Sequence, residues 1–288
     1  MASKSKEKIP VVVLLTPKWL ITTGKIIQKL STTLAIKFAV WLFTKTLRYP
    51  LPKRELAMFN QSKKQLIKLN KYPEKIYVYN YGIGAKKILL VHGWAGSGTQ
   101  LATIATQLVS LGYSVVSFDA PGHGKAPGKS SIIPHFVTAI LQLEQTHGPF
   151  EFAIGHSLGG MSLLRAVRKG LNINRLITIG IANSISKIIT DFAKNMQLNP
   201  SVAKGMKHYF DNLLGSDIDE FSAAVSARYT KIPTLVVHDR DDVDVAITAA
   251  YEIHRELPQG TLYITEGLGH RKILGDPEVI AKVVDFIQ

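Results

Sequence analysis

A serine lies between two glycines in the pentapeptide Gly155-His156-Ser157-Leu158-Gly159. The residues before it, Phe152 to Gly155, are apolar as in a buried strand, and those after it, Leu158 to Lys169, have helical spacing. A Gly-x-Ser-x-Gly turn between strand and helix is so sharp that the serine is strained, and the glycines let the two elements approach closely. The pattern predicts that Ser157 is a nucleophile.

A serine hydroxyl attacks poorly at neutral pH unless a base takes its proton, and the base needs an acid to hold its tautomer. The histidines after Ser157 lie in a helical insertion, at a strand end, in a helix and in a glycine-rich loop: His208, His238, His254 and His270. Only His270 follows the last expected strand, in the loop Glu266-Gly267-Leu268-Gly269-His270. We therefore expect His270 to be the general base.

The acid is expected at the end of the strand that precedes this loop. The segment there carries a group of carboxylates: Asp239, Asp241, Asp242 and Asp244. The residues alone leave Asp242 and Asp241 as competing candidates. Asp119 ends an earlier strand and is a third candidate, but its more ordinary role would be to pin the loop from Ala120 to Gly124 through hydrogen bonds.

An oxyanion hole needs two backbone N–H groups directed at the developing charge. Leu158 begins the helix after the turn, where free N–H groups and the helix dipole favour an anion. The second N–H is expected from His92-Gly93-Trp94, at the end of the expected strand Ile88 to His92. We assign it to Trp94, whose indole would overhang the site.

Short apolar runs alternate with helical stretches from residue 76 onward. The expected strands are Ile76 to Tyr81, Ile88 to His92, Ser114 to Asp119, Phe152 to Gly155, Leu176 to Ile181, Thr234 to His238 and Leu262 to Thr265. Several are continuous apolar runs, which indicates strands that are covered on both faces. The alternation predicts an α/β fold with a mostly parallel central sheet and helices on both faces.

The segment 182–231 interrupts this alternation, because it has helical spacing and no strand signal. Its apolar residues include Ile185, Ile189, Phe192, Met206 and Phe210. An insertion of this length between two strands is a candidate lid over the site. A pair of extra packing helices is the alternative, and the two roles can coexist.

Residues 1–75 form a basic extension, with 16 Lys and Arg against three Glu, a net charge of +13 out of +14 for the whole chain. The spacing from Leu30 to Arg48 predicts an amphipathic helix with one polar stripe: Thr33, Lys37, Trp41, Thr44 and Arg48. We expect this helix to pack on the domain of residues 76–288. The alternative is a peripheral contact of residues 1–50 with anionic lipid. The apolar stretches Ile9 to Thr23 and Thr32 to Thr44 are too short to cross a membrane.

Several segments together resemble the α/β-hydrolase superfamily: His92-Gly93-Trp94, Phe118 to Gly124, Gly155 to Gly160, His238 to Asp242 and Gly267 to His270. The resemblance covers residues 76–288 and includes the chain order nucleophile, acid, histidine. In that family the acid commonly lies four residues after the histidine that ends its strand, which favours Asp242. The stretch from Leu90 to Gly96 is similar to esterase and lipase-like members. Ala246 departs from the family, where many relatives carry proline. The resemblance implies no cofactor and no metal.

Other chemistries are disfavoured by the composition. The 288 residues include no cysteine, which excludes a thiol nucleophile, disulfides and cysteine-ligated metals. The segment Gly124 to Ser130 looks like a phosphate-binding loop, but the spacing requires glycine where His123 stands, and Pro127 lacks an N–H. No nucleic-acid-binding motif accompanies the basic extension, so no nucleic-acid partner is expected.

We therefore expect a serine hydrolase that cleaves a carboxylic ester of a small to medium hydrophobic substrate through an acyl-enzyme. A thioesterase, amidase or acyltransferase with the same triad is the first alternative. A non-catalytic, membrane-associated lipid-binding protein is the second. We expect a cytoplasmic location, with peripheral membrane attachment as the alternative, and the sequence carries no signal for an oligomeric state.

Overall fold

The computed structural model describes residues 17–288. The first part of the apolar stretch from Ile9 to Thr23 therefore lies outside the described residues. Within residues 17–288, no helix combines the length and the hydropathy that a membrane-crossing segment needs.

The core is an eight-stranded sheet in the order β1-β2-β4-β3-β5-β6-β7-β8. Its strands are Lys63–Lys68 (β1), Lys75–Tyr81 (β2), Lys87–Val91 (β3), Ser114–Asp119 (β4), Phe152–His156 (β5), Arg175–Ile179 (β6), Thr234–Asp239 (β7) and Gly260–Thr265 (β8). β1 and β2 pair antiparallel with their neighbours, and all other pairs are parallel. The predicted mostly parallel sheet is confirmed.

Central strands are buried along nearly their whole length, as their continuous apolar runs predicted. Every residue of β5 and of β7 is buried. The parallel register aligns His156 with Ile179 and Asp239 with Thr265. The loops that follow β5, β6, β7 and β8 therefore leave the sheet at the same edge.

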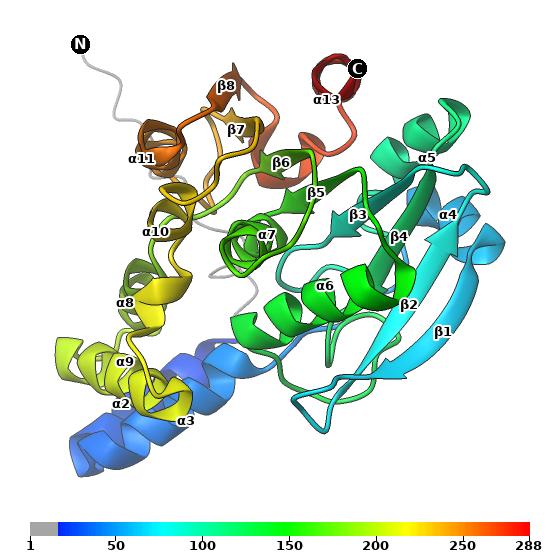
Figure 1. Ribbon diagram of the computed structural model, residues 1–288. Helices are drawn as coiled ribbons and strands as arrows, with labels where there is room; N and C mark the ends of the chain where they lie inside the picture. The colour runs from blue at the N-terminus through cyan, green and yellow to red at the C-terminus, as the bar shows by residue number, and fades with distance from the viewer. Residues whose placement is uncertain (1–16) are drawn as a thin grey trace.

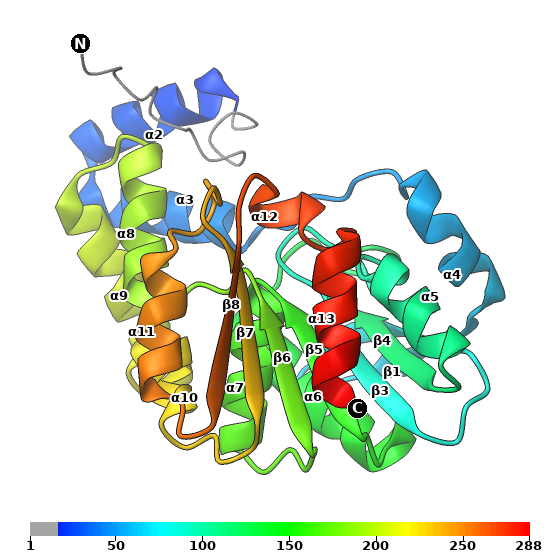
Figure 2. The ribbon, with the colours of Figure 1, turned by 90° about the horizontal axis from the view of Figure 1, so that it is seen from above.

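Helices cover both faces of this sheet (Figures 1 and 2). One face is covered by Leu56–Gln61 (α4), Ala102–Ser110 (α5) and Pro277–Ile287 (α13). The other is covered by Ile133–His147 (α6), Leu158–Arg168 (α7), Ala223–Ala227 (α10) and Thr248–Glu256 (α11). The sheet and these helices are accompanied by two 3₁₀ turns, Lys53–Glu55 (η1) and Ile218–Phe221 (η2), and by the short helix Gly269–Lys272 (α12).

Strand β1 corrects the sequence-based domain boundary at residue 76. This strand pairs with β2 from Lys63 to Lys68, inside the segment that the sequence assigned to the extension. It is exposed almost throughout and rich in lysine, as edge strands often are, so it lacks the apolar run by which the other strands were predicted. The sheet therefore begins before residue 76.

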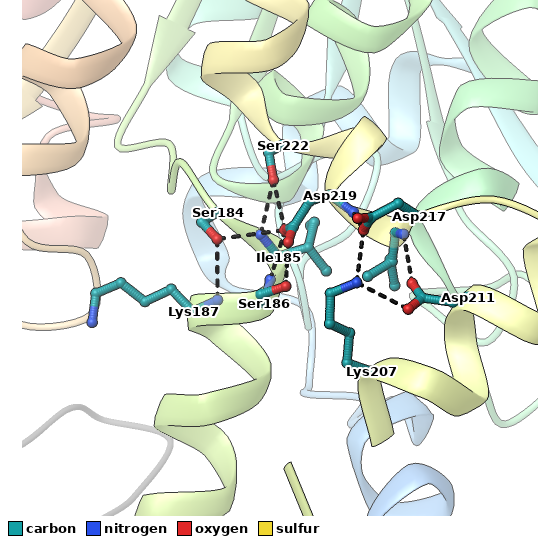
Figure 3. A network of polar contacts seen from close by, with 10 residues as sticks. Ser184, Ile185, Ser186, Lys187, Lys207, Asp211, Asp217, Asp219 and Ser222 are labelled. Carbon is teal, nitrogen blue, oxygen red and sulfur yellow. Dashed lines mark hydrogen bonds and ion pairs between the residues drawn. The ribbon is translucent and has the colours of Figure 1, made fainter. Parts of the chain in front are cut away.

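The insertion 182–231 is helical, as predicted, and consists mainly of Ile185–Asn195 (α8), Pro200–Leu214 (α9), η2 and α10. A polar network ties η2 to both long helices (Figure 3). The Asp219 carboxylate accepts hydrogen bonds from the N–H of Ser186 at 2.9 Å and the hydroxyl of Ser222 at 3.0 Å. Lys207 contacts Asp211 at 2.9 Å and Asp217 at 2.8 Å.

Two N-terminal helices, Lys18–Leu30 (α2) and Thr32–Thr44 (α3), pack against this insertion (Figure 1). The sequence predicted a single helix from Leu30 to Arg48, and the structure corrects both ends. Ser31 is extended, and its hydroxyl accepts a hydrogen bond from the N–H of Leu34, so that it caps the start of α3. The chain is extended again at Lys45. Arg48 therefore lies outside α3 and does not belong to the polar stripe that the sequence predicted for it.

Candidate active site

Ser157 occupies the sharp turn between β5 and α7. Its backbone has φ 51° and ψ −122°, a conformation that residues other than glycine rarely adopt. The strand and the helix touch at this turn, because a Cβ on Gly155 would lie 2.6 Å from the Cα of Gly160. A Cβ on Gly159 would collide with the carbonyl oxygen of Val91. The turn is therefore possible only with glycines at these positions, and it projects the serine from the carboxyl edge of the sheet.

His270 and Asp242 meet at this same edge. The Nδ1 atom of His270 lies 2.7 Å from Oδ2 of Asp242. The other oxygen of Asp242 accepts the N–H groups of Asp244 and Val245, each at 2.8 Å. Because a carboxylate only accepts, Nδ1 carries the ring proton and Nε2 is left able to take one. His270 lies in α12, directly after the glycine-rich segment in which the sequence placed it.

The rival carboxylates have other partners. The Oδ2 atom of Asp241 accepts the N–H of Gly267 at 3.1 Å. Asp119 is fully buried and accepts the N–H of Gly98 at 2.5 Å, the N–H of Lys125 at 2.6 Å and the hydroxyl of Tyr79 at 2.8 Å. Asp119 thus holds the loops that follow β3 and β4 to each other.

The structure connects the His270 segment with the Ser157 turn through short contacts. The residue before the serine, His156, has its Nε2 atom 2.9 Å from the carbonyl oxygen of His270. The N–H of Ser157 donates to the carbonyl of Ile179 at 2.9 Å, and a Cβ on the next residue, Gly180, would lie 3.3 Å from Nδ1 of His270. Serine, imidazole and carboxylate therefore occupy one end of the sheet.

The loop after β3 borders the serine from the other side. A Cβ on Gly93 would lie 2.9 Å from the Cβ of Ser157, so this backbone passes directly beside the serine. The next residue, Trp94, is half-buried, and its indole makes an edge contact with His123 at a centroid distance of 5.1 Å. Leu158 is the first residue of α7, where the N–H has no partner within the helix.

Part of the chain matches a known family model. Residues 84–223 match the model of a family described as serine aminopeptidase, S33. This region contains the Trp94 loop and the Ser157 turn, and the strand order around it is that of an eight-stranded α/β sheet. The match spans just under half of the chain, and together with the sheet it supports an α/β-hydrolase fold.

Solved structures show that the fold is the α/β-hydrolase fold. An esterase from Pyrococcus furiosus is 18% identical with a TM-score of 0.63, and the match covers 85% of this chain and 97% of that one. A monoacylglycerol lipase from Paleococcus ferrophilus is 22% identical with a TM-score of 0.57, over 74% and 98% of the two chains. A serine hydrolase-like protein of Dictyostelium discoideum is 26% identical over 137 residues, which span 44% of this chain and only 38% of that relative.

Sequence reasoning missed two side chains that hold segments of the candidate site in place. Gln100 accepts the N–H of Gly93 at 2.9 Å and so holds the loop that precedes Trp94. His156 was read only as the variable residue of the pentapeptide, although its ring lies 4.6 Å from that of His270. No local pattern marks either residue, because each acts on a segment that is distant in sequence.

Two buried histidines near the candidate site, His92 and His156, are in their neutral form. Burial lowers the pKa of His92 to about 4 and lowers the pKa of His156 well below its usual value. His92 can therefore donate from Nδ1 to the carbonyl of Gly93 at 2.7 Å while its Nε2 accepts the N–H of Ala120 at 3.1 Å. The His92 ring links the loops after β3 and β4, the His156 ring links the end of β5 to the segment after β8, and neither places a positive charge under the site. Among residues 17–288, no cluster of three or more His, Asp or Glu side chains could hold a metal ion.

Proposed function

We propose that this α/β-hydrolase is a serine hydrolase that cleaves carboxylic esters through an acyl-enzyme. The observation that carries the proposal is the 2.7 Å contact between Asp242 and His270 at the edge where Ser157 is held in its strained turn. That contact leaves Nε2 of His270 free to act as a base. The esterase and the lipase with the same fold support this class of reaction.

The proposed reaction assigns one role to each group. The Oγ atom of Ser157 attacks the substrate carbonyl carbon while Nε2 of His270 takes the hydroxyl proton. The ester C–O bond then breaks and the leaving alkoxide takes that proton from His270. Water then attacks the acyl carbon while Nε2 of His270 takes its proton. The bond to Oγ of Ser157 breaks and Oγ takes that proton, which releases the acid and restores the serine. Asp242 holds the imidazole and stabilises its positive charge.

The oxyanion is proposed to bind to the N–H groups of Trp94 and Leu158. Leu158 supplies a helix N-terminal donor, and Trp94 lies one residue beyond Gly93, which passes beside the serine. These donors stabilise charge that develops only in the transition state, and each such donor typically contributes about 10²- to 10³-fold in rate.

A hydrophobic acyl or leaving group of small to medium size is part of this proposal. The insertion begins two residues after Gly180, which lies beside His270, and its helices carry apolar side chains into the core. We propose that the insertion covers the bound substrate as a lid. The network in Figure 3 ties its long helices to η2, so this part should move as a unit.

Replacement of Ser157 tests the proposal directly. Wild-type protein should react with a fluorophosphonate probe and hydrolyse p-nitrophenyl esters in a chain-length panel, whereas Ser157→Ala should lose the label and at least about 10³-fold in kcat. Ser110→Ala is the matched control, because Ser110 is exposed at the end of α5 and should leave both readouts unchanged. A wild-type protein that neither labels nor cleaves any ester, thioester or amide would contradict the proposal.

A further inference from the structure

Helices α2 and α3 leave several large apolar side chains exposed, although both helices also bury an apolar face. The exposed fractions are 64% for Trp19, 55% for Ile26, 79% for Leu30, 55% for Leu34 and 49% for Trp41. Isolated exposed apolar residues are ordinary on protein surfaces, but here five of them lie on two consecutive helices. We call these five residues, together with Lys18, Lys29 and Lys37, the α2–α3 surface.

The apolar residues of α2 form two separate faces. Leu20 and Gly24 are buried, and a Cβ on Gly24 would lie 3.2 Å from the side chain of Leu198 in the insertion. Trp19, Ile26 and Leu30 are spaced by seven and four residues, so they share a different side of the helix. Contact with the insertion therefore uses one face of α2 and leaves a second apolar face to solvent.

The α2–α3 surface is also strongly basic. Residues 17–54 contain eight Lys and Arg and no Asp or Glu, so that this segment has no carboxylate of its own to neutralise them. Lys18, Lys29 and Lys37 are exposed, and the Nζ atom of Lys45 lies 4.4 Å above the Trp41 ring. Two lysines of α2 lie beside its outward apolar face. Lys18 directly precedes Trp19, and Lys29 directly precedes Leu30 and follows Ile26 by three positions.

We propose that the α2–α3 surface binds the surface of an anionic lipid bilayer, with both helices lying in the plane of the interface. Apolar side chains would enter the headgroup region while lysines contact lipid phosphates, and tryptophan is favoured at that depth. An acidic protein or a nucleic acid would match the charge but would not require the exposed Trp and Leu side chains. The proposal goes beyond ester hydrolysis and does not depend on Ser157.

The surface is connected to the loop beside the candidate active site. After α3, the hydroxyl of Thr46 donates to the carbonyl of Gly122 at 2.9 Å, and Arg48 donates to the carbonyl of Ala126 at 2.6 Å. The next residue after Gly122, His123, contacts the Trp94 ring. A bilayer bound at α2 and α3 would therefore contact a segment that is hydrogen-bonded to the loop beside Trp94, the proposed oxyanion donor.

Flotation of the full-length protein with vesicles tests the proposal. Wild-type protein should float with vesicles of phosphatidylcholine that contain about one quarter phosphatidylglycerol and bind weakly to phosphatidylcholine alone. Ser157→Ala should float like wild type, which separates membrane binding from catalysis. Failure of the wild type to bind anionic vesicles, or equal binding to both kinds of vesicle, would overturn the proposal.

Paired variants distinguish the surface from general charge. Lys29→Glu/Lys37→Glu should lower the partition coefficient at least about tenfold, since each lysine near an anionic bilayer contributes on the order of a fivefold change. Lys169→Glu/Lys272→Glu changes the net charge by the same amount at exposed positions elsewhere and should retain most of the binding. Equal losses in the two pairs would overturn the assignment to α2 and α3.

The apolar part of the surface has its own test. Trp19→Gln/Trp41→Gln should weaken vesicle binding, whereas Ile83→Gln/Tyr251→Gln, which removes exposed apolar side chains elsewhere, should not. The chain has three tryptophans, so Trp94→Phe leaves only Trp19 and Trp41 as reporters. Brominated lipids should quench their fluorescence in anionic vesicles. Binding without quenching would show attachment through another surface and overturn the proposal.

Discussion

Asp242 uses both of its carboxylate oxygens. One accepts two backbone N–H groups from the turn that follows it, and the other faces His270. The side chain is almost completely buried, and His238 lies 3.8 Å away on the same oxygen. Burial lowers the pKa of His238, so this neighbour stays neutral and leaves His270 as the partner of the carboxylate. The carboxylate of Asp242 is thus held by the backbone of Asp244 and Val245 while its other oxygen faces the imidazole.

Asp242→Asn should reduce kcat/KM on the best ester substrate by about 10²- to 10⁴-fold, because an amide can no longer hold the tautomer that leaves Nε2 unprotonated. Asp241→Asn is the control at the neighbouring position, where the carboxylate accepts the N–H of Gly267. We expect less than about a tenfold change for that variant. Initial-rate kinetics of both variants measure the difference. Comparable losses of kcat/KM would contradict the assignment of Asp242 as the acid.

Helix α3 packs closely on helix α9 because Gly205 has no side chain. A Cβ at this position would collide with the end of Ile36 in α3. Nearby, the ring of Phe43 in α3 lies 5.2 Å from that of Phe192 and 5.8 Å from that of Phe210. The N-terminal helices are therefore joined to the insertion by a continuous apolar contact, in agreement with the packing role that the sequence favoured for them.

Gly205→Ala should lower the free energy of unfolding by about 1 to 3 kcal/mol, because the added methyl group displaces Ile36. Ile36→Ala should relieve that collision, so the double variant should be more stable than the sum of the two single costs predicts. Urea unfolding of the four proteins measures the coupling. Gly275→Ala is the control, since a Cβ there would meet only ordinary contacts at 3.9 Å. Strictly additive costs would contradict the proposed close approach.

Several titratable groups lie buried in the molecule, and their effects on stability have opposite signs. Burial lowers the pKa of His92 from 6.5 to about 4, so the unfolded chain takes up that proton first as the pH falls. His123 and His156 are shifted in the same direction by burial. Burial raises the pKa of Asp119 from 3.8 to about 6, so the folded chain takes up that proton first. The histidines thus destabilise the fold on acidification and Asp119 opposes them.

The free energy of unfolding should therefore fall as the pH drops from about 6.5 towards 4, with about 3 kcal/mol of the loss due to His92 alone. His92→Gln should be less stable than wild type at pH 7, since it loses the ring contacts with both loops. Over the range from pH 6.5 to 4.5, however, the variant should lose about 2 to 3 kcal/mol less than wild type does. Urea titrations across this range measure both slopes, and parallel curves would contradict the assignment.

The sequence by itself determined the features that neighbouring residues control. Apolar runs specified the central strands because a strand buried on both faces must be apolar throughout, and strand β1 escaped prediction because an exposed edge strand need not be. The glycines around Ser157 specified the turn because only their missing side chains allow it. These signals act over a few residues and can be read locally.

Tertiary structure decided the contacts between segments that are distant along the chain. The sequence alone offered Asp241 and Asp242 side by side, and only the pairing of β7 with β8 determines which carboxylate reaches His270. The contacts of His156 with His270 and of Gln100 with Gly93 depend on packing in the same way. The position of α2 and α3 also depends on packing. The sequence of an amphipathic helix specifies its apolar face, and only the surrounding fold determines what covers that face.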